Sequence, residues 1–155
     1  MAIYHHVPSK VELLRLALDR ALDALFAVTE EPGATTGRAI DRLEHVVRGS
    51  VRVLAAELPF VTLLLRVRGN SEVEQAALQR RRRFDRIVTD LVRRAEEEGD
   101  VRPDVDPAVT SRLLFGAVNS LTEWYRPDQR PGQGLDARAL ADALVATTFD
   151  GLRTR

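Results

Sequence analysis

The densest group of chemically capable side chains in this sequence is a run of four arginines, Arg80 to Arg83, followed directly by Phe84. A guanidinium group is planar, permanently charged and able to bind a carboxylate or a phosphate through two parallel hydrogen bonds. Successive residues of a helix are rotated by about 100°, so the four side chains cannot all face one ligand. The helical phase of the neighbouring apolar residues places Arg80 and Arg81 nearest the apolar side, with Arg82 toward solvent.

Two interpretations of this arginine run are open. The arginines can form a solvated face, paired with the acids of the same helix, Glu72, Glu74 and Asp85, of which Asp85 stands three and four residues from Arg82 and Arg81. They can instead form an anion clamp for a carboxylate or a phosphate, in which Arg80 and Arg83 are the candidate ligand-binding residues. The spacing alone does not choose between them.

Other segments supply candidates for an apolar cavity with one polar group. These candidates are Phe60, Leu63, Leu64, Phe84, Phe115 and Asn119. Each of them can equally pack in an ordinary core. Trp124 can form a wall of the pocket with Arg126 at its mouth, or it can pack in the core or in a dimer interface.

Composition excludes several classes of function. The 155 residues include 23 basic and 23 acidic side chains and no cysteine, so disulfides, thiolate metal sites and cysteine nucleophiles are ruled out. Zero net charge argues against nucleic-acid binding by the bulk of the chain, because phosphate neutralisation needs a basic excess on one face. The consecutive residues Glu96, Glu97 and Glu98 cannot converge on a metal, and His45 is interpreted as structural. We therefore expect no metal, no cofactor and no enzymatic activity.

Helical periodicity dominates the whole chain, and no run alternates cleanly at period two. Ser9, Ser71, Asp106 and Asp136 are expected to cap helices, and Pro59 to interrupt one. The predicted helices cover about 10–29, 35–58, 60–67, 71–98, 106–125 and 136–152. The expected fold class is all-α, a single bundle of about six helices behind a short N-terminal segment. Because no apolar run is long enough to span a membrane and no signal-peptide pattern opens the chain, we expect no membrane association and a cytoplasmic location.

The N-terminal segment Ile3-Tyr4-His5-His6-Val7-Pro8-Ser9-Lys10 carries a family resemblance. It resembles the end of the recognition helix of TetR-family transcriptional regulators, with Val7 in place of the usual Phe. The segment from Gly99 to Pro107 is similar to the entry into the penultimate helix of that family. Trp124-Tyr125-Arg126-Pro127 and the arginine run resemble a subgroup with acyl-CoA-responsive members, including repressors of steroid-ring catabolism.

This resemblance implies a ligand-responsive regulator, most of whose chain is an effector-binding and dimerisation domain. Residues 1–9 would be the remnant of a helix-turn-helix, and residues 10–155 the effector domain. Tyr4, His5 and Lys10 would contact DNA in the full-length parent. The family places two further helices upstream of this motif, so we expect operator binding only where those helices are present. The alternative is a stand-alone helical ligand-binding or protein-interaction module that does not bind DNA.

The resemblance also implies a homodimer and a ligand that shifts the helix 10–29. The last two predicted helices carry apolar residues on more than one face, which indicates a four-helix interface between two copies. The candidate interface residues are Leu114, Val118, Leu121, Leu140, Leu144 and Phe149. The expected effector is a small apolar or acyl-CoA-like molecule with an anionic group. Arginines lie beside the predicted cavity, whereas no acidic residue there is expected to bind a cation.

Overall fold

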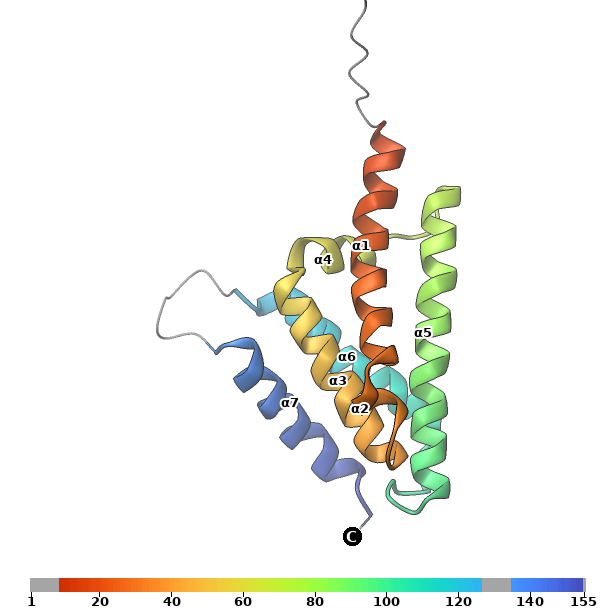
Figure 1. Cartoon of the computed structure of the whole chain (residues 1–155), viewed down its shortest axis with the longest axis vertical. Coiled ribbons are helices and arrows are strands. Elements are labelled where there is room, and N and C mark those ends of the chain that lie inside the picture. The colour runs from red at the N-terminus through yellow and green to blue at the C-terminus, as the bar shows by residue number, and fades with distance from the viewer. Residues whose placement is uncertain (1–8, 127–134, 155) are drawn as a thin grey trace, which may run out of the picture.

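A computed structural model describes residues 9–126 and 135–154, and these residues fold into a bundle of seven helices (Figure 1). The helices are α1 (Lys10–Glu30), α2 (Pro32–Thr35), α3 (Ala39–Ala56), α4 (Leu58–Arg66), α5 (Glu72–Glu97), α6 (Pro107–Trp124) and α7 (Ala137–Leu152). Apart from one isolated bridge between Val101 and Arg153, the described residues contain no β-structure. The predicted all-α class is confirmed.

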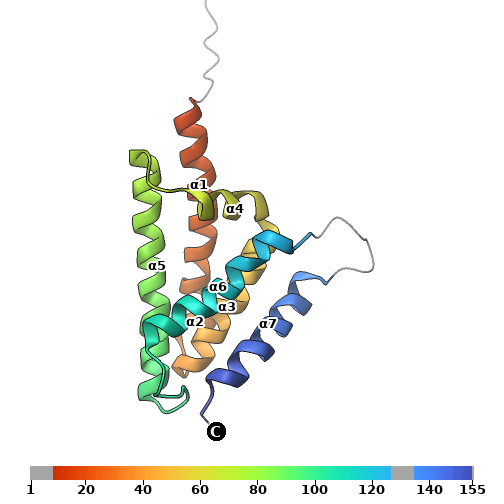
Figure 2. The ribbon, with the colours of Figure 1, turned by 180° about the vertical axis from the view of Figure 1, so that it is seen from behind.

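Helix α3 is the centre of the bundle and contacts every other helix. Leu43, Val46, Val47 and Val51 are fully buried along it. Helices α1 and α5 stand side by side, α4 crosses the bundle near one end, and α7 lies along the outside of α3 (Figure 1). The reverse view shows α6 on the other side of α3 (Figure 2). The buried residues of α3 occupy one broad face, whereas Asp41 and Arg52 are exposed on the opposite side.

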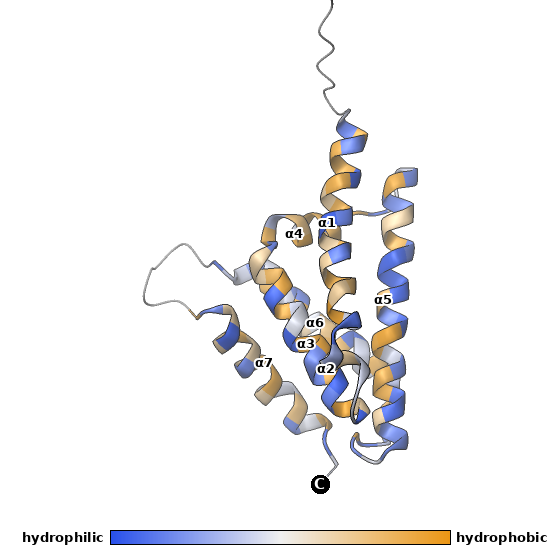
Figure 3. Ribbon diagram, viewed as in Figure 1, coloured by the Kyte–Doolittle hydropathy of each residue, from blue (hydrophilic) through white to orange (hydrophobic). Residues whose placement is uncertain are grey.

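The predicted caps are confirmed, and they explain where four of the helices begin. The side chains of Ser9 and Ser71 accept hydrogen bonds from the backbone N–H groups three residues later, at 3.2 Å each. Asp106 and Asp136 accept from backbone N–H groups in the same way at the starts of α6 and α7. Such caps satisfy donors that have no partner within the helix. Figure 3 shows the hydrophobic and hydrophilic bands that alternate along α1 and α5.

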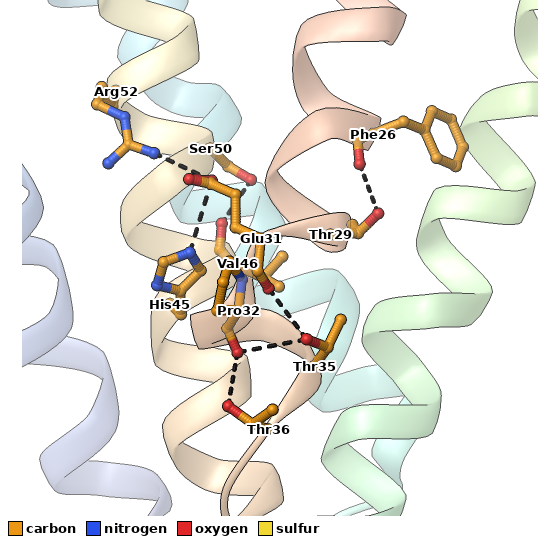
Figure 4. A network of polar contacts seen from close by, with 10 residues as sticks. All are labelled: Phe26, Thr29, Glu31, Pro32, Thr35, Thr36, His45, Val46, Ser50 and Arg52. Carbon is orange, nitrogen blue, oxygen red and sulfur yellow. Dashed lines mark hydrogen bonds and ion pairs between the residues drawn. The ribbon is translucent and has the colours of Figure 1, made fainter.

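The single turn α2 was not predicted, since the expected helices ended at residue 29 and resumed at residue 35. Pro32 stands in the first turn of α2, where a missing N–H costs nothing. The hydroxyl of Thr36 donates to the carbonyl of Pro32 at 2.8 Å, and Ala34 is buried. Figure 4 shows this junction, where the Glu31 carboxylate also faces His45 and Arg52 of α3. Helix α2 thus fixes the turn from α1 into α3.

The crossing of α1 and α3 depends on a glycine that sequence reasoning did not single out. A Cβ atom placed on Gly49 would lie 2.3 Å from Cγ1 of Val28. Real Cβ atoms do not approach other atoms so closely, so the two helices meet at a distance that only glycine permits. This contact fixes the position of the C-terminal half of α1.

Candidate effector site

A cavity of about 50 Å³ lies among α1, α3, α4, α5 and α6. Its walls are mainly apolar. They comprise Leu22 and Leu25 from α1, Ser50 and Leu54 from α3, Val61, Leu64 and Leu65 from α4, Arg81, Phe84 and Asp85 from α5, and Phe115, Val118 and Asn119 from α6. The cavity therefore lies among the three helices that supplied the sequence candidates, α4, α5 and α6, and α1 and α3 complete its walls. Leu64, Phe84, Phe115 and Asn119 are the predicted ligand residues that the structure brings together here.

Polar groups in the cavity wall differ in whether they already have partners. The Ser50 hydroxyl donates to the Val46 carbonyl at 2.7 Å, so its proton is engaged within α3. The side-chain amide of Asn119 makes no hydrogen bond to any residue that the structure describes. Asn119 is half-buried, and a ligand in the cavity would therefore find an unused donor and acceptor there.

Arg81 and Asp85 stand one helical turn apart on α5 and form the charged part of the wall. Nη1 of Arg81 donates to the carbonyl of Leu64 at 3.3 Å, near the C-terminus of α4. Burial lowers the pKa of Arg81, against the attraction of Asp85. Burial also raises the pKa of Asp85, against the opposing effect of Arg81 and Arg112. Asp85 is thus an acid in the cavity wall that the sequence did not single out, and it lies beside Arg81 and Arg112.

A second depression of about 510 Å³ opens on the surface between α5 and α6. It is lined by Arg81, Arg82, Asp85, Arg86, Thr89, Ala108, Ser111, Arg112, Phe115, Gly116 and Asn119. Four of these residues, Arg81, Asp85, Phe115 and Asn119, also line the inner cavity. The two spaces therefore share a wall, and we call the outer one the α5/α6 groove.

Arg80 and Arg83 lie outside both spaces, which corrects the expectation that they flank the cavity. Arg80 forms ion pairs with Asp19 and Asp23 of α1, at 3.2 and 2.7 Å. Both guanidinium groups also lie over the ring of Phe26. Arg80 does not pair with the acids of its own helix either, because α1 lies against this face of α5. Its role in the structure is to join α5 to α1.

Three other predicted ligand residues also lie away from the cavity wall. The ring of Phe60 is half-buried beneath the guanidinium of Arg20, 4.5 Å from its centroid. Trp124 is 55% exposed at the end of α6, and the neighbouring Tyr125 is buried instead. Arg126 donates to the Tyr125 carbonyl at 2.8 Å. Sequence reasoning did not select Arg81 and Asp85 as ligand residues. Arg81 stands one turn before Phe84, and Asp85 stands one turn before Val88.

The predicted dimer residues lie mostly in the core of their own chain. Leu114, Val118, Leu121, Leu140 and Phe149 are 3% exposed or less, and Leu144 is half-buried. The apolar residues of α6 that do face solvent are Val109, Leu113 and Trp124, at 47%, 69% and 55% exposure. The surplus of apolar residues was recognised correctly, but the outward-facing set differs from the one chosen.

The remaining expectations concern DNA, metal and membrane. Tyr4 and His5 lie outside the described residues, and Lys10 is the exposed first residue of α1. Within residues 9–126 and 135–154, no three His, Asp or Glu side chains come together as metal ligands. None of the helices in this part of the chain is both long and apolar enough to span a membrane.

Comparison with known proteins decides the family. Residues 36–152 match the family model of the tetracyclin repressor-like C-terminal domain. The chain belongs to the TetR family. The resemblance stated from the N-terminal and C-terminal motifs is thereby confirmed, as is the predicted class of function, a ligand-responsive transcriptional regulator.

Three similar proteins indicate where this chain lies within the TetR family. A TetR-family member from Streptomyces coelicolor A3, SCO3833, is 53% identical with a TM-score of 0.88, covering 98% of this chain and 75% of that one. The HTH-type transcriptional repressor KstR2 of Mycobacterium tuberculosis is 24% identical, covering 97% of this chain and 75% of KstR2. The structure of AibR with isovaleryl coenzyme A and operator DNA shares the fold, with a TM-score of 0.74 at 22% identity, over 94% of this chain and 78% of AibR. SCO3833 and KstR2 are transcriptional regulators by name, which favours the regulator over a stand-alone module.

Proposed function

We propose that residues 10–155 are the effector-binding and dimerisation domain of a cytoplasmic repressor. Its effector is a small apolar or acyl-CoA-like molecule that enters the inner cavity. The observation that carries this proposal is the apolar cavity closed on one side by α1, through Leu22 and Leu25. Two similar proteins support the proposal. KstR2 is a repressor by name, and AibR was crystallised with isovaleryl coenzyme A, which is an acyl-CoA.

The size of the cavity links binding to movement. A space of about 50 Å³ is a third of the roughly 150 Å³ that an engineered protein cavity offers to benzene. An acyl chain therefore fits only if the surrounding helices separate. Because α1 forms one wall and its N-terminal end extends beyond the other helices, separation moves that end of α1 as well (Figure 1).

Ion pairs connect α1 to the helices that surround the cavity. Arg80 of α5 holds Asp19 and Asp23, and Arg20 of α1 holds Glu57 beside α4 at 2.8 Å. These contacts connect α1 to α5 and to the junction of α3 and α4. An effector that separates α4 from α5 therefore changes the position of α1, which provides the allosteric coupling to DNA binding.

Dimerisation uses the outward face of α6 together with α7. Val109, Leu113 and Trp124 form an exposed apolar row on α6, and the small residues Ala143 and Ala146 are exposed on α7. An exposed apolar row of this kind is stabilised when a second copy covers it, and a two-fold arrangement is the commonest closed solution. The dimer fixes the separation of two DNA-binding segments, on which recognition of two half-sites depends.

A thermal-shift panel tests the effector class. Straight-chain acyl-CoAs from C4 to C10, isovaleryl-CoA, the free acids and cationic amphiphiles are added to the chain. Acyl-CoAs should raise Tm, and affinity should improve about fourfold per CH₂, from roughly 0.8 kcal/mol each, until the cavity is filled. Stabilisation by cationic amphiphiles alone, or by no member of the panel, would contradict the proposal.

Repression is tested with the native gene in its own genome. Deleting the gene should raise transcription of the genes it controls, and supplying the effector to the wild-type strain should do the same. A deletion strain whose transcripts fall rather than rise would indicate an activator.

A further inference from the structure

The α5/α6 groove carries an excess of positive charge that the chain as a whole does not have. Four arginines line it, namely Arg81, Arg82, Arg86 and Arg112, together with one acid, Asp85. The sequence as a whole balances 23 basic with 23 acidic residues. A local excess within one concave surface raises the positive potential there and attracts anions.

Three of these four arginines have no carboxylate partner within the part of the chain that the structure describes, unlike Arg38, Arg80 and Arg102 elsewhere in the bundle. Arg38 pairs with Asp100 at 2.6 Å, Arg80 with Asp23 at 2.7 Å, and Arg102 with Asp104 at 2.6 Å. By contrast, the guanidinium groups of Arg82, Arg86 and Arg112 make no hydrogen bond and no ion pair within 4.0 Å to any described residue. Their donors are therefore available to a ligand.

The positions of these residues follow from two helix faces. Arg81, Arg82, Asp85 and Arg86 stand at successive turns on one side of α5. Across the groove, Arg112 and Gly116 stand one turn apart on α6. A Cβ atom built on Gly116 meets nothing within 4 Å, so the floor of the groove is open at this point.

The groove leads directly to the inner cavity. Arg81, Asp85, Phe115 and Asn119 belong to the walls of both spaces. A molecule with an apolar end and a phosphate-bearing end would thus meet two matching environments in contact with each other. Apolar burial would hold one end, and charge-assisted, bidentate hydrogen bonds from arginine would hold the other.

We propose that the α5/α6 groove binds the phosphate-bearing head of an acyl thioester effector, with Arg82, Arg86 and Arg112 as phosphate ligands. The acyl end passes between Arg81 and Asn119 into the inner cavity. This assignment rests on the proposed function, because the apolar end occupies the cavity described above. These arginines differ from Arg80 and Arg83, which the sequence suggested as the anion-binding pair.

Isothermal titration of the 155-residue chain tests the assignment, with octanoyl-CoA, octanoate, free CoA and ADP as probes. The variants are Arg86→Ala, Arg112→Ala and the double variant. Arg94→Ala is the matched control, since Arg94 is an exposed arginine of α5 outside the groove. Octanoyl-CoA should bind more tightly than octanoate. Each groove variant should weaken octanoyl-CoA at least tenfold and leave octanoate and the control unchanged.

A steric variant provides a second, charge-independent readout. Gly116→Leu adds a side chain into open space on a helix, so the fold is retained while the groove narrows. It should weaken octanoyl-CoA and free CoA and leave octanoate unchanged. Raised salt should weaken the CoA probes and spare octanoate binding in the cavity.

The outcomes separate this inference from the proposed function. If octanoate and octanoyl-CoA bind equally, or if the groove variants change octanoyl-CoA affinity less than twofold, the groove assignment is overturned while the cavity remains. If ADP binds as tightly as octanoyl-CoA, the groove is a site for free nucleotides and the assignment to a thioester head is overturned. If no probe binds the wild-type chain, both the groove assignment and the proposed effector class fail.

Discussion

The Arg81 side chain of α5 donates a hydrogen bond to the backbone carbonyl of Leu64 in α4, at 3.3 Å. This carbonyl lies in the last turn of α4, where acceptors lack intrahelical partners and a cation is favourable. Arg81 also lines both the inner cavity and the α5/α6 groove. An anion in the groove therefore competes with α4 for the same guanidinium group, which couples the head of a ligand to the helix over its apolar end.

Removing Arg81 should loosen α4. Arg81→Met keeps much of the apolar stem and deletes the donor, and we expect a loss of about 1 kcal/mol in the free energy of unfolding. Arg82→Met, at the exposed neighbouring position with no partner among the described residues, should change stability by less than about 0.5 kcal/mol. Urea unfolding followed by circular dichroism measures both. Equal effects of the two substitutions would show that the bond to Leu64 is not significant.

Two helical glycines should respond in opposite ways to alanine. Gly49→Ala places a methyl group against Val28 and should destabilise by about 1–3 kcal/mol, because the crossing of α1 and α3 is overpacked. Gly116→Ala adds a methyl group in open space and should stabilise by about 0.5–1 kcal/mol through helix propensity. Calorimetry should show Tm shifts of opposite sign. A stabilising Gly49→Ala would contradict the close approach.

Asp85 should make stability depend on pH. Burial raises its pKa in the folded chain, against the attraction of Arg81 on α5 and Arg112 on α6. The protonated form is thus favoured by folding, and this contribution is lost as pH rises through the folded-state pKa. Asp85→Asn should therefore be more stable than wild type at pH 7, with the difference shrinking on acidification to pH 4. The urea unfolding midpoints of wild type and Asp85→Asn at pH 7 and pH 4 measure this difference. A stability difference that grows toward pH 4 would contradict the prediction.

The outward face of α6 should control assembly. Leu113→Glu places a charge at a position that is 69% exposed in one chain and buried in the proposed dimer, so dimer affinity should fall at least tenfold. Leu16→Glu, at a position 61% exposed on α1, is the matched control and should leave the dimer intact. Sedimentation equilibrium distinguishes them. A wild-type chain that is monomeric at micromolar concentration would contradict the assembly itself.

Local signals were sufficient for most of the fold. Ser9, Ser71, Asp106 and Asp136 marked helix starts because a cap depends on residues within one turn of it. The turn α2 was missed because its stability depends on burial of Ala34 beneath neighbouring helices, which no local pattern reveals.

The position of the cavity was predicted, but the residues that line it were predicted only in part. Phe84 and Phe115 were recognised because buried aromatic residues mark the inner face of each helix. Arg80 and Arg81 both lie near the apolar stripe of α5, so the sequence could not show which of them faces the cavity. That depends on which helix packs against each side of α5. Helix α1 brings Asp19 and Asp23 to Arg80, whereas α4 and α6 border the side of Arg81. Those partners are distant in sequence, so residue spacing alone could not assign them.

An effector that enters the inner cavity should displace α1. Amide hydrogen exchange of the chain, measured by mass spectrometry with and without saturating octanoyl-CoA, tests it most directly. We expect altered exchange in peptides covering Leu22 and Leu25 of α1 and in α4, with little change in the outer face of α7. Saturated binding with unchanged exchange throughout α1 would show that the effector does not displace this helix.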